Sequence, residues 1–123
     1  MVKLWAYDYE EEAGAAILYT NADCTGRSGA LLSGHKGTVA GFTKGDMKKN
    51  NVPDNTASAV RVPPGYTLDL WQGNNFTQTM ERITGDKDSS GKIACQPLKK
   101  TSNVVTSAKL WNHRKKDFDE LFS

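Results

Sequence analysis

The segment from Asp54 to Ser58 places a carboxylate, an amide and a hydroxyl close together, on Asp54, Asn55 and Ser58. Ca²⁺ takes about six to eight oxygen ligands, and side-chain carboxylates, amides and hydroxyls all serve, as do backbone carbonyls. The spacing therefore fits a calcium-binding loop. It fits equally well a turn in which these side chains bond the nearby backbone without any metal. These residues alone leave both interpretations open.

The same pattern returns at position 102, an offset of 48 residues from Asp54. The matching residues of this second segment are Ser102, Asn103 and Thr106. They have no formal charge, whereas the first segment has the carboxylate of Asp54. Because ligand charge is a main determinant of calcium affinity, we expect a dissociation constant of about 10⁻⁴ to 10⁻³ M or weaker at the first segment. The second should be nearly inert at cytosolic calcium levels.

A second pair of segments repeats as well. The stretch from Leu18 to Gly34 aligns with the stretch from Leu70 to Gly85, and Tyr19 matches Trp71 at an offset of 52 residues. The first copy contains one extra residue, which fits a β-bulge. Since two separate segments recur in the same order at similar offsets, the chain is predicted to use one motif of four strands twice.

Short strand patterns separated by glycine and proline dominate the chain. In the segment YTLDLW, which begins at Tyr66, Leu68 and Leu70 alternate with polar residues, as expected for a β-strand. Similar patterns occur at residues 2–7, 58–62 and 107–111. Many short strands with frequent turns predict an all-β sandwich or barrel. The apolar side chains expected to form its core are Val60, Val62, Leu68, Leu70, Ala108 and Leu110.

Residues 19–26 and 71–78 each begin with an aromatic residue, Tyr19 or Trp71. The matching positions that follow are Cys24 and Gly26 in the first segment, and Phe76 and Gln78 in the second. Together with the two oxygen-rich segments, this order of motifs resembles the βγ-crystallin superfamily over roughly residues 14 to 112. Each copy departs from the superfamily pattern. Gln78 replaces the glycine in the second hairpin motif, and Cys24 replaces the second aromatic residue in the first. In the calcium motifs, Ala59 replaces the terminal serine and Ser102 the leading Asp or Asn.

The resemblance implies an all-β, βγ-crystallin-like two-sheet sandwich built from two Greek key motifs. Residues 1–123 would form one domain, with a first Greek key at about 14–64, a second at about 65–113, and N- and C-terminal extensions. In the superfamily, a backbone carbonyl from the first hairpin of the other Greek key completes each calcium loop. Thr20 and Gln72 are the candidates here. The terminal serine of the calcium motif would brace the hairpin, and bound Ca²⁺ would stabilise the fold.

Composition bears on partners and location. The formal net charge is +2 and the isoelectric point about 8.5, so nothing supports a nucleic-acid or acidic-membrane partner. The N-terminus MVKLWAYDYEEE lacks the apolar core of a secretory signal, and no apolar run reaches transmembrane length. We therefore expect a cytoplasmic protein.

Cys24 and Cys95 form no CxxC motif and are expected to be reduced thiols in or near the core, with a disulfide left open. The tail has Phe118, Leu121 and Phe122 at helical spacing, which predicts a short amphipathic turn or a frayed terminus.

No catalytic constellation emerges. The segment GHKGTVAG lacks the Lys-Ser/Thr end of a phosphate-binding loop, and nothing orients His35 as a base for Cys24. The chain is expected not to be an enzyme.

We expect a structural, storage or stress protein with weak or degenerate calcium loops, with the calcium ion as its one predicted partner. The alternatives are a calcium-stabilised developmental protein and an interaction module such as a toxin or inhibitor. The low ligand charge favours the first hypothesis.

Overall fold

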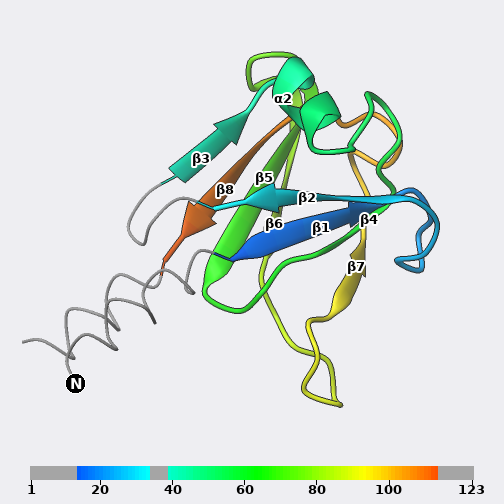
Figure 1. Ribbon diagram of the computed structural model, residues 1–123, viewed down its shortest axis with the longest axis vertical. Coiled ribbons are helices and arrows are strands. Elements are labelled where there is room, and N and C mark those ends of the chain that lie inside the picture. Colours follow the sequence, from blue (N-terminus) through cyan, green and yellow to red (C-terminus); the bar gives the residue numbers. More distant parts are fainter. Residues whose placement is uncertain (1–13, 34–38, 114–123) are drawn as a thin grey trace, which may run out of the picture.

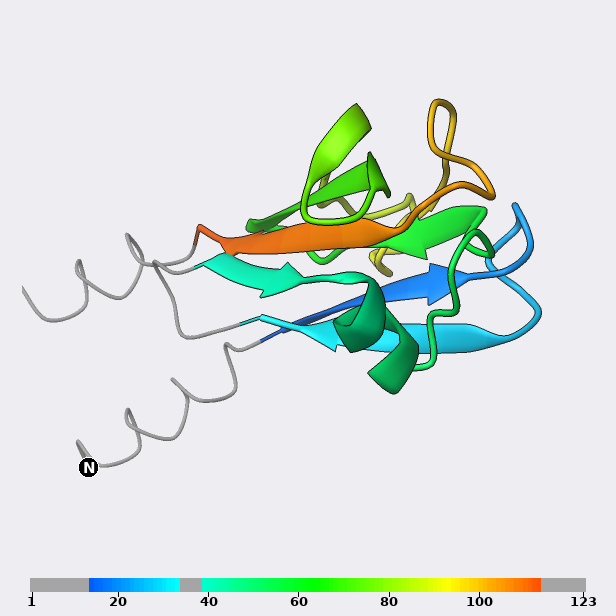
Figure 2. The same cartoon turned by 90° about the horizontal axis from the view of Figure 1, so that it is seen from above.

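The computed structural model describes residues 14–33 and 39–113, which form two antiparallel sheets that face each other (Figures 1 and 2). One sheet has the strand order β2-β1-β4-β7, with β2 at Ser28–Leu32, β1 at Ala15–Tyr19, β4 at Ala59–Arg61 and β7 at Cys95–Pro97. The other has the order β3-β8-β5-β6, with β3 at Val39–Phe42, β8 at Ser107–Asn112, β5 at Tyr66–Gly73 and β6 at Thr77–Thr84. The predicted all-β two-sheet sandwich is confirmed.

The two halves of the chain exchange strands. β1 to β4 precede the turn at Pro63-Pro64-Gly65, and β5 to β8 follow it. β3 nevertheless pairs with β8 in the second sheet, and β7 pairs with β4 in the first. Each sheet therefore contains three strands from one half and one strand from the other, so neither half forms a complete sheet alone. The strand expected at residues 2–7 and the turn expected at Phe118 to Phe122 lie outside the described residues.

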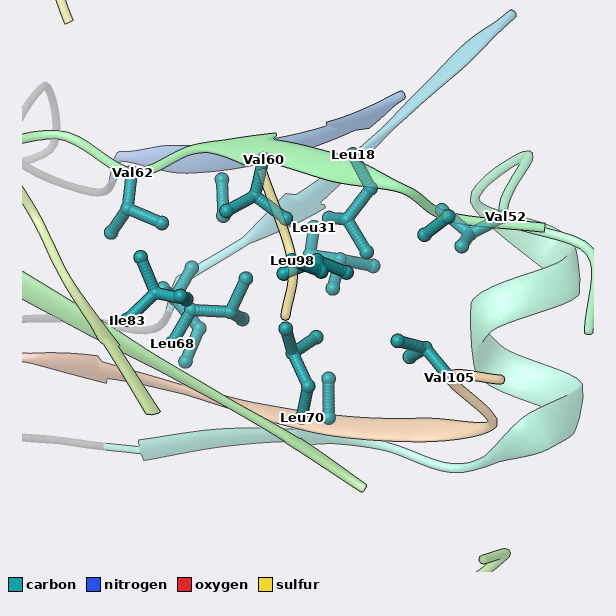
Figure 3. Packing of buried hydrophobic residues seen from close by; sticks show 14 of the residues in the cluster. Leu18, Leu31, Val52, Val60, Val62, Leu68, Leu70, Ile83, Leu98 and Val105 are labelled. Atoms are coloured by element: carbon teal, nitrogen blue, oxygen red, sulfur yellow. The ribbon is translucent and has the colours of Figure 1, made fainter. Parts of the chain in front are cut away.

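The core lies between the two sheets, as Figure 3 shows from close by. The six residues predicted to form it are all fully buried, which confirms that prediction: Val60, Val62, Leu68, Leu70, Ala108 and Leu110. Leu18 and Leu31 from the first sheet pack against them, together with Leu98 and Val105 from the segments that precede β8. Burial of each leucine or valine side chain contributes on the order of 1.5–3 kcal/mol, so this cluster is the main source of stability.

β5 lies between β8 and β6 in the sheet, and most of its residues on the outward face are buried as well. Asp69 on this face is only 2% exposed. Its carboxylate accepts two hydrogen bonds from the Arg82 guanidinium, at 2.7 and 2.9 Å, and one from the Trp111 indole N–H at 2.9 Å. The hydrogen bonds from Arg82 to Asp69, together with the charge of Asp69, raise the pKa of Arg82. Asp69 is thus a buried carboxylate with its partners in place, as burial of a charge requires.

One helix was not predicted. α2, at Lys44–Lys49, follows β3 and lies at one end of the sandwich (Figure 1). Thr43 precedes it, and both the backbone N–H and the hydroxyl of Thr43 donate to the Asp46 carboxylate, at 3.1 and 3.0 Å. The backbone and hydroxyl hydrogen bonds from Thr43 lower the pKa of Asp46. Met47 anchors the helix in the core with 1% exposure. Among the described residues, no helix has the length and apolar character needed to cross a membrane.

Candidate metal centre at the paired loops

The two oxygen-rich segments lie against each other, and we call residues 54–58 loop A and residues 102–106 loop B. The Asn55 N–H donates to the Val105 carbonyl at 3.1 Å, and the Asn103 N–H donates to the Ala57 carbonyl at 2.8 Å. Each residue in one hydrogen bond corresponds, at an offset of 48, to a residue in the other. The two loops are therefore related by a local pseudo-twofold axis, and the repeat seen in the sequence is a repeat in space.

Each loop is also fastened to a hairpin of its own half. The Ser58 N–H donates to the Tyr19 carbonyl at 2.8 Å, and the Thr106 N–H donates to the Trp71 carbonyl at 2.9 Å. Thr20 and Gln72, the residues whose carbonyls were expected to complete the sites, come directly after these two anchor residues. Each therefore follows, along the chain, a residue whose carbonyl is bonded to one of the loops. Their role as calcium ligands stays a prediction.

The side chains of the loops pair across the axis and not along the chain. The Thr106 hydroxyl donates to Asp54 Oδ1 at 2.6 Å. The Ser58 hydroxyl donates to Asn103 Oδ1 at 2.7 Å. The axis places the beginning of each loop beside the end of the other, so each pair takes one side chain from each half of the chain. The sequence grouped Asp54 with Ser58 and Asn103 with Thr106, whereas the structure exchanges the hydroxyls between the two groups.

The donor set at these pairs suits a hard cation. Asp54 is the single carboxylate among the predicted ligands, and the rest are amide, hydroxyl and carbonyl oxygens. Within residues 14–33 and 39–113, no group of three or more His, Cys, Asp or Glu side chains is placed to hold a metal ion. Oxygen ligands with little charge fit Ca²⁺ at the weak end of its affinity range. The residues present therefore fit calcium at Asp54 and Thr106 better than at Asn103 and Ser58.

Asn55 and Asn103 have a backbone reason to be asparagine. Their φ angles are 60° and 62°, in the left-handed region that asparagine tolerates better than most residues. Both side chains are exposed. The turn interpretation alone therefore explains the second position of each loop, with or without a metal ion. The remaining predicted ligand, Ser102, is half-buried and begins loop B.

Glu81, on β6, holds the chain that leads into loop B and was not singled out from the sequence. Its side chain is 8% exposed and accepts hydrogen bonds from three consecutive backbone N–H groups, those of Lys99, Lys100 and Thr101, at 2.9 to 3.1 Å. The Thr101 hydroxyl donates to it as well. Burial raises the pKa of this carboxyl, but the hydrogen bonds together outweigh burial, and the pKa lies below its ordinary value.

Ser107 braces the second hairpin, as expected from the resemblance. It is fully buried, its hydroxyl donates to the Gly73 carbonyl at 2.6 Å, and it accepts the Phe76 N–H at 3.0 Å. The matching residue in the first half is Ala59, which is also fully buried. There, the Cys24 N–H donates to the Asn21 carbonyl at 3.1 Å. The first hairpin thus closes without a serine.

The expectation of two reduced thiols was wrong, because Cys24 and Cys95 form a disulfide. β7 crosses to the first sheet and pairs with β4, which brings Cys95 beside the β1–β2 loop. The Cα atoms of the two cysteines are then 6.0 Å apart, although 71 positions separate them in the sequence. The sequence alone does not indicate that β7 pairs with β4, so it could not predict that the two cysteines meet. Cys24 is buried at the position where the resemblance predicted an aromatic residue.

No protein-family profile matches the chain, and neither does any curated protein. Solved structures do match. The N-terminal domain of protein S is 22% identical over 80% of this chain and 97% of its own, with a TM-score of 0.64. A βγ-crystallin domain from Clostridium beijerinckii is 20% identical over 80% of this chain and 98% of its own, with a TM-score of 0.62. One from Flavobacterium johnsoniae is 21% identical over 80% and 96%, also with a TM-score of 0.62. At these identities the likeness shows the fold, and this chain has the fold of the βγ-crystallin superfamily.

Proposed function

We propose that this chain is a non-enzymatic structural or storage protein, or a stress protein, whose paired loops form a weak calcium site. The observation that carries the proposal is the 2.6 Å hydrogen bond from Thr106 to Asp54, which joins the two loops through oxygen atoms suited to Ca²⁺. A cation held there would contact both halves of the chain. Its role would be to stabilise the fold and not to react.

The size of the stabilisation follows from mass action. A ligand that binds only the folded chain adds RT ln(1 + [L]/Kd) to the free energy of unfolding. With a dissociation constant of about 1 mM, about 10 mM Ca²⁺ adds roughly 1.4 kcal/mol. Tighter binding is not expected, since Asp54 supplies the single charge. The Thr106 hydroxyl hydrogen, which now points at Asp54, would also have to turn away from the ion.

The cysteine chemistry supports the absence of enzymatic activity. A catalytic cysteine acts as a thiolate. The sulfur of Cys24 is bonded to that of Cys95, so neither cysteine offers a thiolate. An interaction module, such as a toxin or inhibitor, is the second candidate. Small secreted toxins and inhibitors commonly contain disulfides, and the Cys24–Cys95 bond is consistent with this candidate. Assays of the intact protein against a panel of proteases test the inhibitor form of this alternative.

The disulfide also bears on location. The cytoplasmic location predicted from the N-terminus stays a prediction, and the Cys24–Cys95 bond weighs against it, because disulfides persist mainly in oxidising compartments. Cell fractionation after rapid alkylation of free thiols tests both statements at once. A cytoplasmic protein with both cysteines alkylated would retain the predicted location and show that the bond does not persist in cells.

Calorimetric titration with CaCl₂ after chelator treatment tests the proposed calcium site directly. The unmodified protein should bind with a millimolar dissociation constant, and its melting temperature should rise by several degrees at about 10 mM Ca²⁺ at matched ionic strength. Asp54→Asn keeps an oxygen acceptor for Thr106 but removes the charge, so it should abolish both effects. Equal shifts with and without Asp54 would contradict the site, and no shift at all would mean that the loops are turns.

A further inference from the structure

Lys44 places an ammonium group beside the one carboxylate of the paired loops. Its Nζ lies 3.7 Å from Asp54 Oδ2, with the two side chains 59% and 30% exposed. Asp54 accepts the Thr106 hydroxyl on its other oxygen, Oδ1. We propose that Lys44 is an internal cation that competes with Ca²⁺ for Asp54 and thereby sets the affinity of the site. This inference rests on the proposed calcium site, because it concerns the regulation of binding there.

The backbone of Lys44 is held firmly enough for this role. Lys44 is the first residue of α2, and its N–H donates to Asn74 Oδ1 in the β5–β6 turn at 3.1 Å. The residue before it, Thr43, bonds the Asp46 carboxylate twice, and Met47 fixes the helix in the core. The starting point of the lysine side chain is therefore fixed relative to loop A. With the backbone fixed, only the side-chain rotamers of Lys44 remain to be restricted when the ammonium stays near the carboxylate.

Asp54 is also accessible to ions from solvent. It lines a surface hollow together with Lys44, Gly45, Lys48, Pro53 and Asn74. A calcium ion that enters this hollow meets the carboxylate and the Lys44 ammonium together. Both cations seek the same oxygen atoms, and they repel each other. Lys48 lines the same hollow, so its substitution removes one positive charge from the same surface and serves as a matched control.

The expected effect is moderate. An exposed ion pair contributes little by itself, and salt screens it. A divalent ion doubles the repulsion that a lysine ammonium exerts at a given distance. We therefore expect removal of the Lys44 charge to tighten calcium binding on the order of fivefold. Because both side chains are partly exposed, the fold without calcium should be unchanged.

The test is calorimetric titration with CaCl₂ at low, fixed ionic strength, on intact protein freed of metal by a chelator. Lys44→Gln should bind calcium on the order of fivefold more tightly than the unmodified protein. Lys44→Arg keeps the charge and should bind as the unmodified protein does. Lys48→Gln should change the affinity far less than Lys44→Gln. Combined with Asp54→Asn, Lys44→Gln should add nothing, because the gain acts through that carboxylate.

The outcomes separate this inference from the proposed site. Calcium binding by the unmodified protein with no gain in Lys44→Gln overturns the role of Lys44 and leaves the site intact. An equal gain in Lys48→Gln also overturns it, since net charge would then explain the change. No binding by any of these proteins overturns the site and the inference together. Binding detected in Lys44→Gln but not in the unmodified protein supports both. Thermal unfolding in chelator confirms that each variant is folded.

Discussion

Cys24 and Phe76 occupy equivalent positions in the two halves of the chain, and their φ angles are 62° and 61°. Phe76 packs edge-on against Trp71, with the ring centroids 5.4 Å apart. Cys24 has no ring with which to make such a contact, and it is bonded to Cys95 on β7 instead. One half thus closes its first hairpin by aromatic packing, and the other fastens the same position covalently to a strand from the opposite half.

The first prediction concerns this bond. Reduction, or the double variant Cys24→Ala/Cys95→Ala, should lower the free energy of unfolding by about 2–4 kcal/mol, because the disulfide closes a long loop of the unfolded chain. Urea unfolding with and without reductant, followed by fluorescence, measures the difference. The double variant should no longer respond to reductant. A midpoint that reductant leaves unchanged in the unmodified protein would contradict the stabilising role.

The second prediction concerns Glu81. Its pKa is lower in the folded chain than its ordinary value of 4.5, so its contribution to stability is complete above that value. The contribution is lost as the pH falls through the folded pKa, because the carboxyl then gains a proton in the folded chain as well. Glu81→Gln should cost about 2–3 kcal/mol at neutral pH, since an amide nitrogen would face backbone N–H donors.

Urea midpoints measured from pH 3 to pH 7 check this prediction. The Glu81→Gln curve should be flatter than that of the unmodified protein below the ordinary pKa of 4.5. Asp88 is a useful control, because hydrogen bonds from the Ser90 hydroxyl and from the Lys92 and Ser90 N–H groups lower its pKa too, but it lies in an exposed turn. Asp88→Asn should leave most of the acid sensitivity in place. If Asp88→Asn flattened the curve as much, Glu81 would not be its source.

The third prediction uses the difference between Ser107 and Ala59. Ser107→Ala should cost about 1–3 kcal/mol, because the Phe76 N–H and the Gly73 carbonyl would both lose a buried partner. The reverse change in the first half, Ala59→Ser, should not stabilise the protein. The Cys24 N–H already donates to the Asn21 carbonyl, and Ala59 is fully buried. Thermal unfolding compares the two variants. A stabilising Ala59→Ser would contradict this, because it would show that the first hairpin still has backbone groups for a serine hydroxyl to bond.

The repeat could be read from the sequence because its backbone requirements recur. Asn55 and Asn103 share a left-handed conformation, and Gln78 has a φ of 67° where the first half has Gly26 at 87°. Gln78 therefore replaces the glycine of the motif but keeps its left-handed backbone conformation. The helix α2 could have been predicted too, since Thr43 and Asp46 have the spacing of a helix cap. The segment is only six residues long and contains Gly45, so its helical pattern is weak.

The pairing of the loops could not be predicted in the same way. The Thr106 to Asp54 hydrogen bond spans 52 positions, and the bonds from Lys99 to Thr101 onto Glu81 span 18 to 20. No local pattern specifies which hydroxyl meets which carboxylate, because that depends on how the two halves exchange strands. The disulfide depended on the same exchange. Local chemistry thus indicated which oxygen-bearing side chains lie in the two loops, and the topology decided which of them pair.

The last prediction tests this crossed pairing. Ser102 matches Asp54, so Ser102→Asp should give loop B the carboxylate that it lacks and create a second calcium site. By the local pseudo-twofold axis, the hydroxyl beside that carboxylate is the one on Ser58. Calorimetry should show a second binding event in Ser102→Asp. Lys99 and Lys100 lie just upstream, so the new carboxylate should also be tolerated without metal.

The crossed pairing also predicts which hydroxyl each of the two calcium sites requires. Added to Ser102→Asp, Ser58→Ala should remove the new binding event and leave the event at Asp54. Thr106→Val should do the opposite, because the Thr106 hydroxyl is bonded to Asp54 and not to its own loop. If each hydroxyl served the carboxylate of its own loop, the two effects would be exchanged. Two variants in one background therefore decide between pairing along the chain and pairing across the axis, with thermal unfolding in chelator as the check that both remain folded.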